Sequence, residues 1–255
     1  MAKMPGPAVP MERGFQQPRQ ERMPEIIARR ILHHIVNEDL HPGDMLPSET
    51  AMIEQLGIGR GTLREALRIL EVYGIIRIKP GQRGGPMVDA IDADDYARNL
   101  SVWLFISRAT YRELLEARMI LEPGVARSAA TRGSEEARAA VLEAAEANHR
   151  AVGSLGSEWL RSSEAFHEAI AVASGNRVIS LFSSALLGLN RERLPSTPSE
   201  KRALTCKAHD NIANAIAQGD GAKAERLMRE HVADFVALVE ERIGDELDAV
   251  IDRPR

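Results

Sequence analysis

The segment LPSETAMIEQLGIGRGTLREALRILEVYGII, residues 46–76, determines the fold of the first part of this chain. Its pattern predicts a short helix, a glycine-containing turn, a second helix and the start of a strand. The second helix carries Arg60, Arg64 and Arg68 at four-residue steps, so these side chains share one helical face. Its apolar positions fall on a different face: Leu63, Ala66, Leu67 and Leu70. A helix with one arginine face and one buried face is suited to the major groove of DNA.

The flanking sequence extends this segment into a small domain. Residues 24–38 (PEIIARRILHHIVNE) place isoleucines at helical spacing and predict a preceding helix. Residues 75–80 (IIRIKP) and 86–90 (PMVDA) predict two short strands that flank a glycine-rich turn. We therefore expect a winged helix-turn-helix domain, an α+β fold, over residues 21–90.

The composition changes after Asp92, where strand signals end and internal glycine and proline become scarce. Residues 94–246 are expected to form an all-helical bundle, which makes the whole chain mainly α. Seven helices are expected, at about 94–107, 110–131, 134–152, 156–173, 176–191, 198–218 and 220–244. Residues 1–20, which are rich in proline, glycine and glutamine, are predicted to be a mobile arm.

The bulk composition limits the class of protein. The net charge of −4 argues against a protein that coats nucleic acid along its whole length, but it allows a local basic face. The single cysteine, Cys206, excludes an internal disulfide framework and favours a cytoplasmic, reducing compartment. No apolar run approaches the roughly 18 residues of a membrane span, so we expect no membrane partner.

Three blocks in the first domain carry a family resemblance. They are PG..LPSE (42–49), GIGRGTLREALRIL (57–70) and GII (74–76). Their order and spacing closely resemble the winged helix of GntR-type bacterial transcription regulators.

Three further blocks resemble one branch of the same family. They are YRELLEARMILEPGVARSAA (111–130), AFHEAIAVASGN (165–176) and HDNIANAIAQGDGAKAERLMREHV (209–232). They are similar to the FadR-type C-terminal effector domain, called FCD. The resemblance implies a ligand-responsive regulator whose helical domain binds the effector and forms a homodimer.

The resemblance also implies a set of DNA-facing residues. Arg60 and Arg64 match the arginines of the recognition helix, and an arginine can bond guanine O6 and N7 bidentately. Thr62 matches a hydroxyl at the start of that helix, and Thr50 stands where relatives often have an arginine. Gly81 matches the glycine at the wing tip that approaches the minor groove. The implied partner is a palindromic double-stranded DNA operator, because two recognition helices on one face of DNA require a two-fold dimer.

No rule of sequence spacing brings His167, His209 and His231 together, but the FCD resemblance places all three at metal-ligand positions. In metal-binding relatives a fourth ligand, an aspartate, lies four residues before the first histidine. Here that position is Ser163, a poor ligand, while Glu164 could point toward the site. Three imidazoles suit Zn²⁺ or Ni²⁺ with open coordination positions, so we expect a divalent metal, with an empty or purely structural cluster as the alternative.

Arg118 resembles the arginine that lines the effector pocket of the family. A guanidinium beside a metal could hold a carboxylate bidentately, and the alternative is a salt bridge with Glu122. Asn190 is a second candidate for the pocket. We therefore predict a small organic acid as effector, and a repressor that this acid releases from DNA.

The sequence leaves two alternative functions open. Three histidines around a metal resemble hydrolytic zinc sites, although no HExxH motif occurs in the chain. A DNA-binding adaptor without ligand sensing is the other alternative. We predict no catalytic residues and no enzymatic activity.

Overall fold

The computed structural model describes residues 21–81, 84–90, 93–190 and 197–251, apart from the side chains of residues 93–96, 98–99 and 190. The predicted arm, residues 1–20, lies outside the described residues. The contacts within the chain divide it into two compact units, Met1–Ile91 and Asp92–Arg255.

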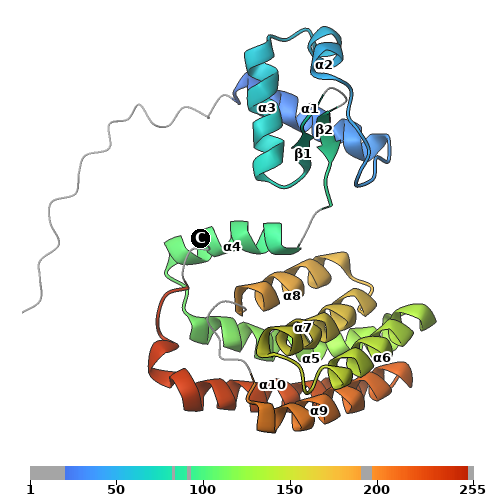
Figure 1. Cartoon of the computed structure of the whole chain (residues 1–255), viewed down its shortest axis with the longest axis vertical. Coiled ribbons are helices and arrows are strands. Elements are labelled where there is room, and N and C mark those ends of the chain that lie inside the picture. Colours follow the sequence, from blue (N-terminus) through green and yellow to red (C-terminus); the bar gives the residue numbers. More distant parts are fainter. Residues whose placement is uncertain (1–20, 82–83, 91–92, 191–196, 252–255) are drawn as a thin grey trace, which may run out of the picture. The chain divides into compact units, whose positions relative to one another are not determined.

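The first unit contains three helices and a two-stranded sheet within its described residues (Figure 1). In chain order they are α1 (Met23–Asn37), α2 (Glu49–Leu56), α3 (Arg60–Val72), β1 (Ile76–Lys79) and β2 (Gly85–Val88). The strands are antiparallel, with Ile76 opposite Val88 and Lys79 opposite Gly85. This is the predicted winged helix-turn-helix fold.

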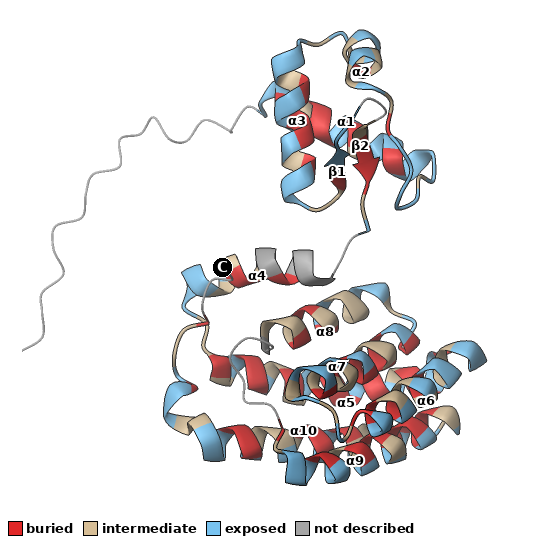
Figure 2. Ribbon diagram, viewed as in Figure 1, coloured by how far each residue is buried: buried red, intermediate tan, exposed pale blue. Residues whose placement is uncertain are grey.

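Local sequence explains how α2 and α3 form their turn. The Ser48 side chain caps α2 by accepting a 3.2 Å hydrogen bond from the Ala51 amide. Gly57 ends α2 with a φ of +64°, a left-handed conformation that costs glycine little. The buried side chains of α3 are the four predicted from its periodicity: Leu63, Ala66, Leu67 and Leu70. They pack with buried isoleucines of α1, so that one face of α3 remains exposed (Figure 2).

The second unit is helical, as predicted. Its helices are α4 (Ala93–Ser107), α5 (Tyr111–Arg132), α6 (Glu135–Arg150), α7 (Gly156–Ala173), α8 (Arg177–Asn190), α9 (Ser199–Ala217) and α10 (Gly221–Ile243). Helix α5 lies inside the bundle, where α7, α8, α9 and α10 all contact it. The core of the bundle is rich in alanine, which lets the helices approach closely around larger residues such as Phe166 and Ile170.

The packed core of the second unit continues beyond residue 246, where the sequence analysis ended the domain. A short 3₁₀ helix, η2 (Gly244–Glu246), follows α10 and turns the chain back. Leu247 and Ile251 are then buried against Tyr111 and Leu114 at the start of α5. Among the described residues, none of the helices has the length and apolar character that a membrane crossing requires.

Candidate DNA-binding face and metal centre

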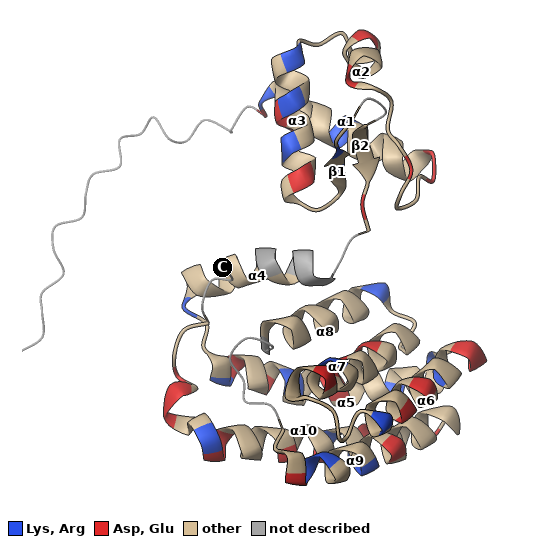
Figure 3. Cartoon of the chain, in the orientation of Figure 1, with Lys and Arg blue, Asp and Glu red and all other residues tan. Residues whose placement is uncertain are grey.

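Helix α3 presents a basic face to solvent. Arg60, Arg64 and Arg68 are all exposed, and Figure 3 shows basic residues along one side of this helix. Gly59 precedes the helix without a side-chain cap, so the first backbone amides of α3 have no capping side chain at that position. A basic helical face beside uncapped amides is suited to phosphate and base contacts.

The other residues predicted to face DNA belong to the same unit. Thr62 is partly exposed on the first turn of α3, and Thr50 is exposed on α2. Gly81 follows β1 with a φ of +111° and its carbonyl accepts a 2.8 Å hydrogen bond from the Gly84 amide. That backbone conformation explains the glycine at the turn of the wing. Contact of these residues with DNA stays a prediction.

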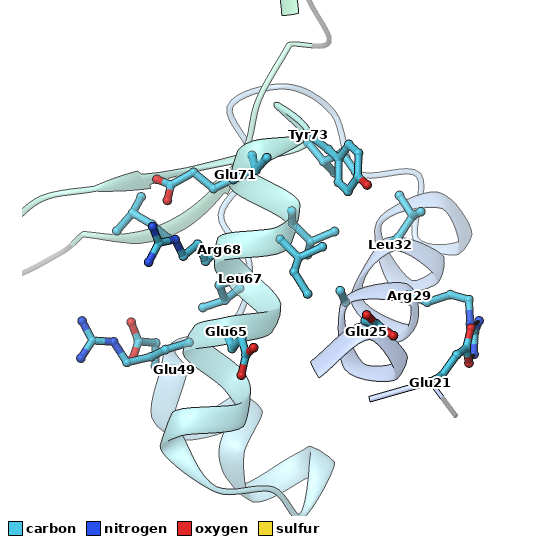
Figure 4. Close-up of a pocket in the computed structure, with 17 residues that line it drawn as sticks. Glu21, Glu25, Arg29, Leu32, Glu49, Glu65, Leu67, Arg68, Glu71 and Tyr73 are labelled. Atoms are coloured by element: carbon cyan, nitrogen blue, oxygen red, sulfur yellow. Dashed lines mark hydrogen bonds and ion pairs between the residues drawn. The ribbon is translucent and has the colours of Figure 1, made fainter. Parts of the chain in front are cut away.

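A hollow of about 1430 Å³ lies beside α3 in this unit (Figure 4). Figure 4 shows Arg68 and Glu71 on the side of α3 that faces away from α1. Arg29 of α1 is paired with Glu21, which precedes that helix, through two hydrogen bonds of 2.5 and 2.7 Å. This hollow mixes exposed charges of both signs. The candidate metal ligands His167, His209 and His231 all lie in the other unit.

In the second unit, His167 of α7, His209 of α9 and His231 of α10 converge on one point. The Nε2 atom of His231 lies 3.2 Å from Nε2 of His209 and 3.3 Å from Nε2 of His167. The exposed fractions are 7% for His167, 0% for His209 and 9% for His231. We call these residues the three-histidine cluster. The tertiary structure thus brings together the three residues that the sequence spacing left apart.

A carboxylate of α5 lies against the first of these histidines. Oε2 of Glu122 lies 2.7 Å from Nδ1 of His167, a close polar contact that lacks the alignment of a hydrogen bond. Oε1 of Glu122 accepts a 2.5 Å hydrogen bond from Nε of Arg118. The guanidinium of Arg118 also lies over the Phe235 ring, 4.9 Å from its centroid. The alternative role for Arg118, a salt bridge with Glu122, is therefore present. Because Glu122 also contacts His167, this salt bridge is connected to the cluster.

The second histidine is held by an amide and a ring. Nδ1 of His209 lies 2.9 Å from Oδ1 of Asn148, a buried residue of α6. The Phe166 ring stacks on the His209 ring with centroids 4.1 Å apart. Cys206 also donates to Oδ1 of Asn148, at a sulfur–oxygen distance of 3.4 Å. Residues of five helices, α5, α6, α7, α9 and α10, therefore surround one point.

Burial sets the charge of two of these histidines, His209 and His231. Burial, and then the neighbouring His231 and His167, hold the pKa of His209 well below its ordinary value. Burial, followed by the electrostatic effect of the neighbouring His167, lowers the pKa of His231 to about 3. Burial alone would raise the pKa of Glu122, but Arg118 and then His167 outweigh it and keep that pKa well below its usual range. Near neutral pH, His209 and His231 are therefore uncharged imidazoles beside an ionised Glu122.

These residues fit a divalent metal ion. Two imidazole nitrogens bound to one Zn²⁺ at about 2.0–2.1 Å are separated by about 3.0–3.4 Å across common coordination angles. The Nε2 separations of 3.2 and 3.3 Å lie in that range. Neutral imidazole is also the form that binds metals. Among the described residues, these three histidines form the group of three or more potential ligands in which each residue offers an atom within 4.8 Å of the others.

The fourth-ligand position differs from the pattern that the sequence analysis expected for metal-binding relatives. Ser163 is partly buried on α7, one turn before His167. Glu164, the predicted substitute, is 8% exposed but lies outside the group of convergent ligand atoms. Three nitrogen ligands without a protein carboxylate leave coordination positions open to small molecules.

A cavity of about 370 Å³ between α9 and α10 reaches the cluster at His231. Its walls include the ring of Phe235 and the polar side chains of Lys201 and Asp234. Arg118, a buried residue of α5 that is 6% exposed, contacts the same Phe235 ring through its guanidinium. Asn190 ends α8, but its side chain lies outside the described residues. Effector binding by Arg118 and Asn190 stays a prediction.

Sequence reasoning missed two residues of this site. Asn148 lies 61 positions from its partner His209, and a lone asparagine in a helix carries no spacing signal. Glu122 was identified only as a salt-bridge partner for Arg118, because the four-residue step shows that contact and not the contact with His167 on another helix.

Comparison with known proteins agrees with this two-unit architecture. Residues 25–84 match "Bacterial regulatory proteins, gntR family", and residues 113–234 match "FCD domain". The chain is 31% identical over 210 residues to the HTH-type transcriptional regulator LutR of Bacillus subtilis, which covers 78% of this chain and 93% of LutR. The chain belongs to the GntR family of bacterial transcription regulators and carries an FCD effector domain. It is a DNA-binding regulator.

Other relatives show the range of this family. The Glc operon transcriptional activator of Escherichia coli is 30% identical over 231 residues, 84% of this chain and 88% of the activator. The HTH-type transcriptional repressor NanR of Salmonella schwarzengrund is 27% identical over 223 residues, 84% of this chain and 82% of NanR. The solved structure of Streptococcus agalactiae GntR has the same fold, with a TM-score of 0.67, 24% identity, and coverage of 82% of this chain and 97% of that protein. These sequence relatives are transcription regulators rather than enzymes.

The lowered histidine pKa values predict acid sensitivity of the metal-free second unit. Below the ordinary histidine pKa of 6.5 the unfolded chain binds protons at His209 and His231 that the folded unit does not. The free energy of unfolding should therefore decrease as the pH is lowered, by up to about 2.7 kcal/mol per pH unit for two such groups. This loss continues toward the folded pKa of His231, about 3, and protonation of Glu122 in the unfolded chain adds to it below 4.5.

Urea unfolding between pH 7.5 and 5 in the presence of a chelator measures this slope. Both tryptophans, Trp103 and Trp159, lie in the second unit, so their fluorescence reports its unfolding. The double variant His209→Gln, His231→Gln should show a flatter dependence. An equal slope in the variant and the natural protein would contradict the assignment.

Proposed function

We propose that this regulator senses a small carboxylic acid at a divalent metal ion held by the three-histidine cluster. The observation that carries the proposal is a buried site in which Nε2 of His231 lies 3.2 Å from Nε2 of His209 and 3.3 Å from Nε2 of His167. Zn²⁺ and Ni²⁺ are the favoured ions because imidazole nitrogens suit both. When bound, either ion supplies positive charge and open coordination positions for a carboxylate oxygen.

The residues of the chain have separate roles in this proposal. His167, His209 and His231 hold the ion, and Ser163 leaves the position of a fourth ligand to water or the effector. Glu122 orients His167, while Arg118 neutralises Glu122 and adds a guanidinium near the site. The 370 Å³ cavity at His231 is large enough for a small organic acid and offers Lys201 at its wall.

The first unit supplies the operator contacts. Arg60 and Arg64 would read bases, Thr62 and Thr50 would bond phosphates or bases, and Gly81 would let the wing approach the minor groove. We propose a homodimer on a palindromic operator in the cytoplasm, because two α3 helices must enter successive major grooves on one face of the duplex.

Exposed apolar side chains of the second unit support its role in dimerisation. Trp103 and Ile106 of α4 are 72% and 67% exposed, and Ile120 of α5 is 75% exposed. Exposed large apolar groups are typical of association surfaces. The same unit would then hold the effector and the two-fold contact, so that effector binding biases the arrangement of the DNA-binding units.

Calorimetry tests the sensing mechanism. The full chain, loaded with Zn²⁺ or stripped with EDTA, is titrated with a panel of two- to six-carbon mono- and dicarboxylic acids. An effector should give heat with the loaded protein only and reduce operator affinity about 5- to 150-fold, the usual range of allosteric coupling. His149→Ala is the matched control, because this exposed histidine pairs with Asp210 outside the cluster.

The alternatives predict different results. Absence of heat together with unchanged operator affinity across the panel would overturn ligand sensing and favour a DNA-binding adaptor. Hydrolysis of simple esters by the natural protein, abolished in His209→Ala, would favour the metal-dependent hydrolase instead. Operator affinity that increases with an effector would retain sensing but reverse the proposed direction, since the relatives include an activator as well as repressors.

A further inference from the structure

The side-chain amide of Asn148 is fixed in one orientation by a chain of hydrogen bonds. Its Nδ2 donates to Oγ of Ser162 over 2.9 Å, and that hydroxyl donates its single proton to the Trp159 carbonyl over 2.7 Å. Because the Ser162 hydroxyl has no second proton, its oxygen must accept from the amide. The Asn148 atom that faces His209 is therefore the oxygen Oδ1.

This orientation determines which nitrogen of His209 carries the proton. An amide oxygen only accepts hydrogen bonds, so Nδ1 of His209, 2.9 Å away, must be the donor. A neutral imidazole has one proton, and Nε2 is then left with its lone pair. That lone pair lies 3.2 Å from Nε2 of His231, at the centre of the three-histidine cluster.

We propose that Asn148 is a positioning residue: it fixes His209 as the Nδ1-protonated tautomer, so that the Nε2 lone pair faces the cluster and can ligate a metal. The inference rests on the proposed metal site and assigns a role to a residue on a separate helix, α6. Partners that bond the second nitrogen of a metal-binding histidine set its tautomer and orientation. The aromatic ring of Phe166 stacks on His209 and holds its plane but has no acceptor to choose the tautomer.

Two variants of Asn148 separate this role from packing. Asn148→Leu keeps the size of the side chain but removes the acceptor. Asn148→Asp keeps an oxygen that accepts from Nδ1. Cys206→Ala is the control, because it removes a buried neighbour that donates to the same amide oxygen and leaves the contact with His209 in place.

The tautomers are read in the metal-free, ¹⁵N-labelled full chain by long-range proton–nitrogen correlation spectra of the histidine rings. We expect His209 to carry its proton on Nδ1 in the natural protein, in Asn148→Asp and in Cys206→Ala. In Asn148→Leu the proton should redistribute to Nε2. Competition with a chelator should then show Zn²⁺ affinity about 10- to 100-fold weaker in Asn148→Leu, the usual cost of losing such a partner, and rescued in Asn148→Asp.

Several results would overturn the role of Asn148. They are a proton on Nε2 of His209 in the natural protein, an unchanged tautomer in Asn148→Leu, and a loss of Zn²⁺ affinity in Cys206→Ala as large as in Asn148→Leu. Failure of the proposed function gives a different pattern. A natural protein with the Nδ1-protonated tautomer but no Zn²⁺ binding would overturn the metal site while supporting the control of His209 by Asn148.

Discussion

Replacing Arg64 with alanine is expected to abolish specific operator binding while the fold and the dimer persist. Arg64 is exposed on α3 and is not among the four residues that form the buried face of that helix. A bidentate contact with guanine contributes about 1–3 kcal/mol of discrimination, and a two-fold complex contains two such contacts. The combined loss of about 2–6 kcal/mol corresponds to a 30-fold to more than 10⁴-fold weaker specific complex.

The DNA probe for this experiment is the fragment that the natural protein enriches most strongly from a random library. Gel shifts and fluorescence anisotropy measure its affinity beside that of an unrelated fragment, at one fixed salt concentration, because phosphate contacts make both affinities depend on salt. Arg226→Ala removes the same charge from an exposed position of α10 and should bind like the natural protein. Circular dichroism and sedimentation velocity check that the fold and the dimer persist.

A selective loss for the enriched fragment identifies Arg64 as a base-reading residue. An equal loss for both fragments would reduce its role to phosphate contact, and an unaltered shift would contradict the assignment of α3 as the recognition helix. Arg60→Ala provides a second, independent substitution on the same face.

Replacing His209 with alanine is expected to remove metal binding from the second unit. Structural zinc sites bind with apparent free energies of about 10–16 kcal/mol, so loss of one of three protein ligands should weaken affinity by 100-fold or more. His209 is the most deeply buried of the three, at 0% exposed, and no other described ligand atom joins the group. Elemental analysis of the purified protein, followed by chelator competition with Zn²⁺ and Ni²⁺, measures the effect.

A buried substitution can also disturb folding, so His231→Gln is measured in parallel. Glutamine keeps a polar side chain of similar length in a residue that borders the 370 Å³ cavity. His149 lies at an exposed position on α6, and His149→Ala should keep the metal content of the natural protein. Equal metal content in His209→Ala, His231→Gln and the natural protein would refute the three-histidine site.

The sequence predicted most of the local structure because its signals are local. The apolar face of α3, the glycine turn at Gly57 and the wing strands follow from the spacing of neighbouring residues, and the structure places each as expected. The metal-ligand positions were predicted only through resemblance, since His167 and His231 lie 64 residues apart. The short segment that carries Leu247 and Ile251 into the core had no periodic signal of its own.

By itself, then, the sequence determined the order and type of the elements, the arginine face of α3 and the family to which the chain belongs. The tertiary structure alone decided that Asn148 faces His209 and that Glu122 lies between Arg118 and His167. The physical reason is range. Helical periodicity fixes which residues share a face within a few turns, whereas the meeting of faces from five helices depends on how their side chains pack.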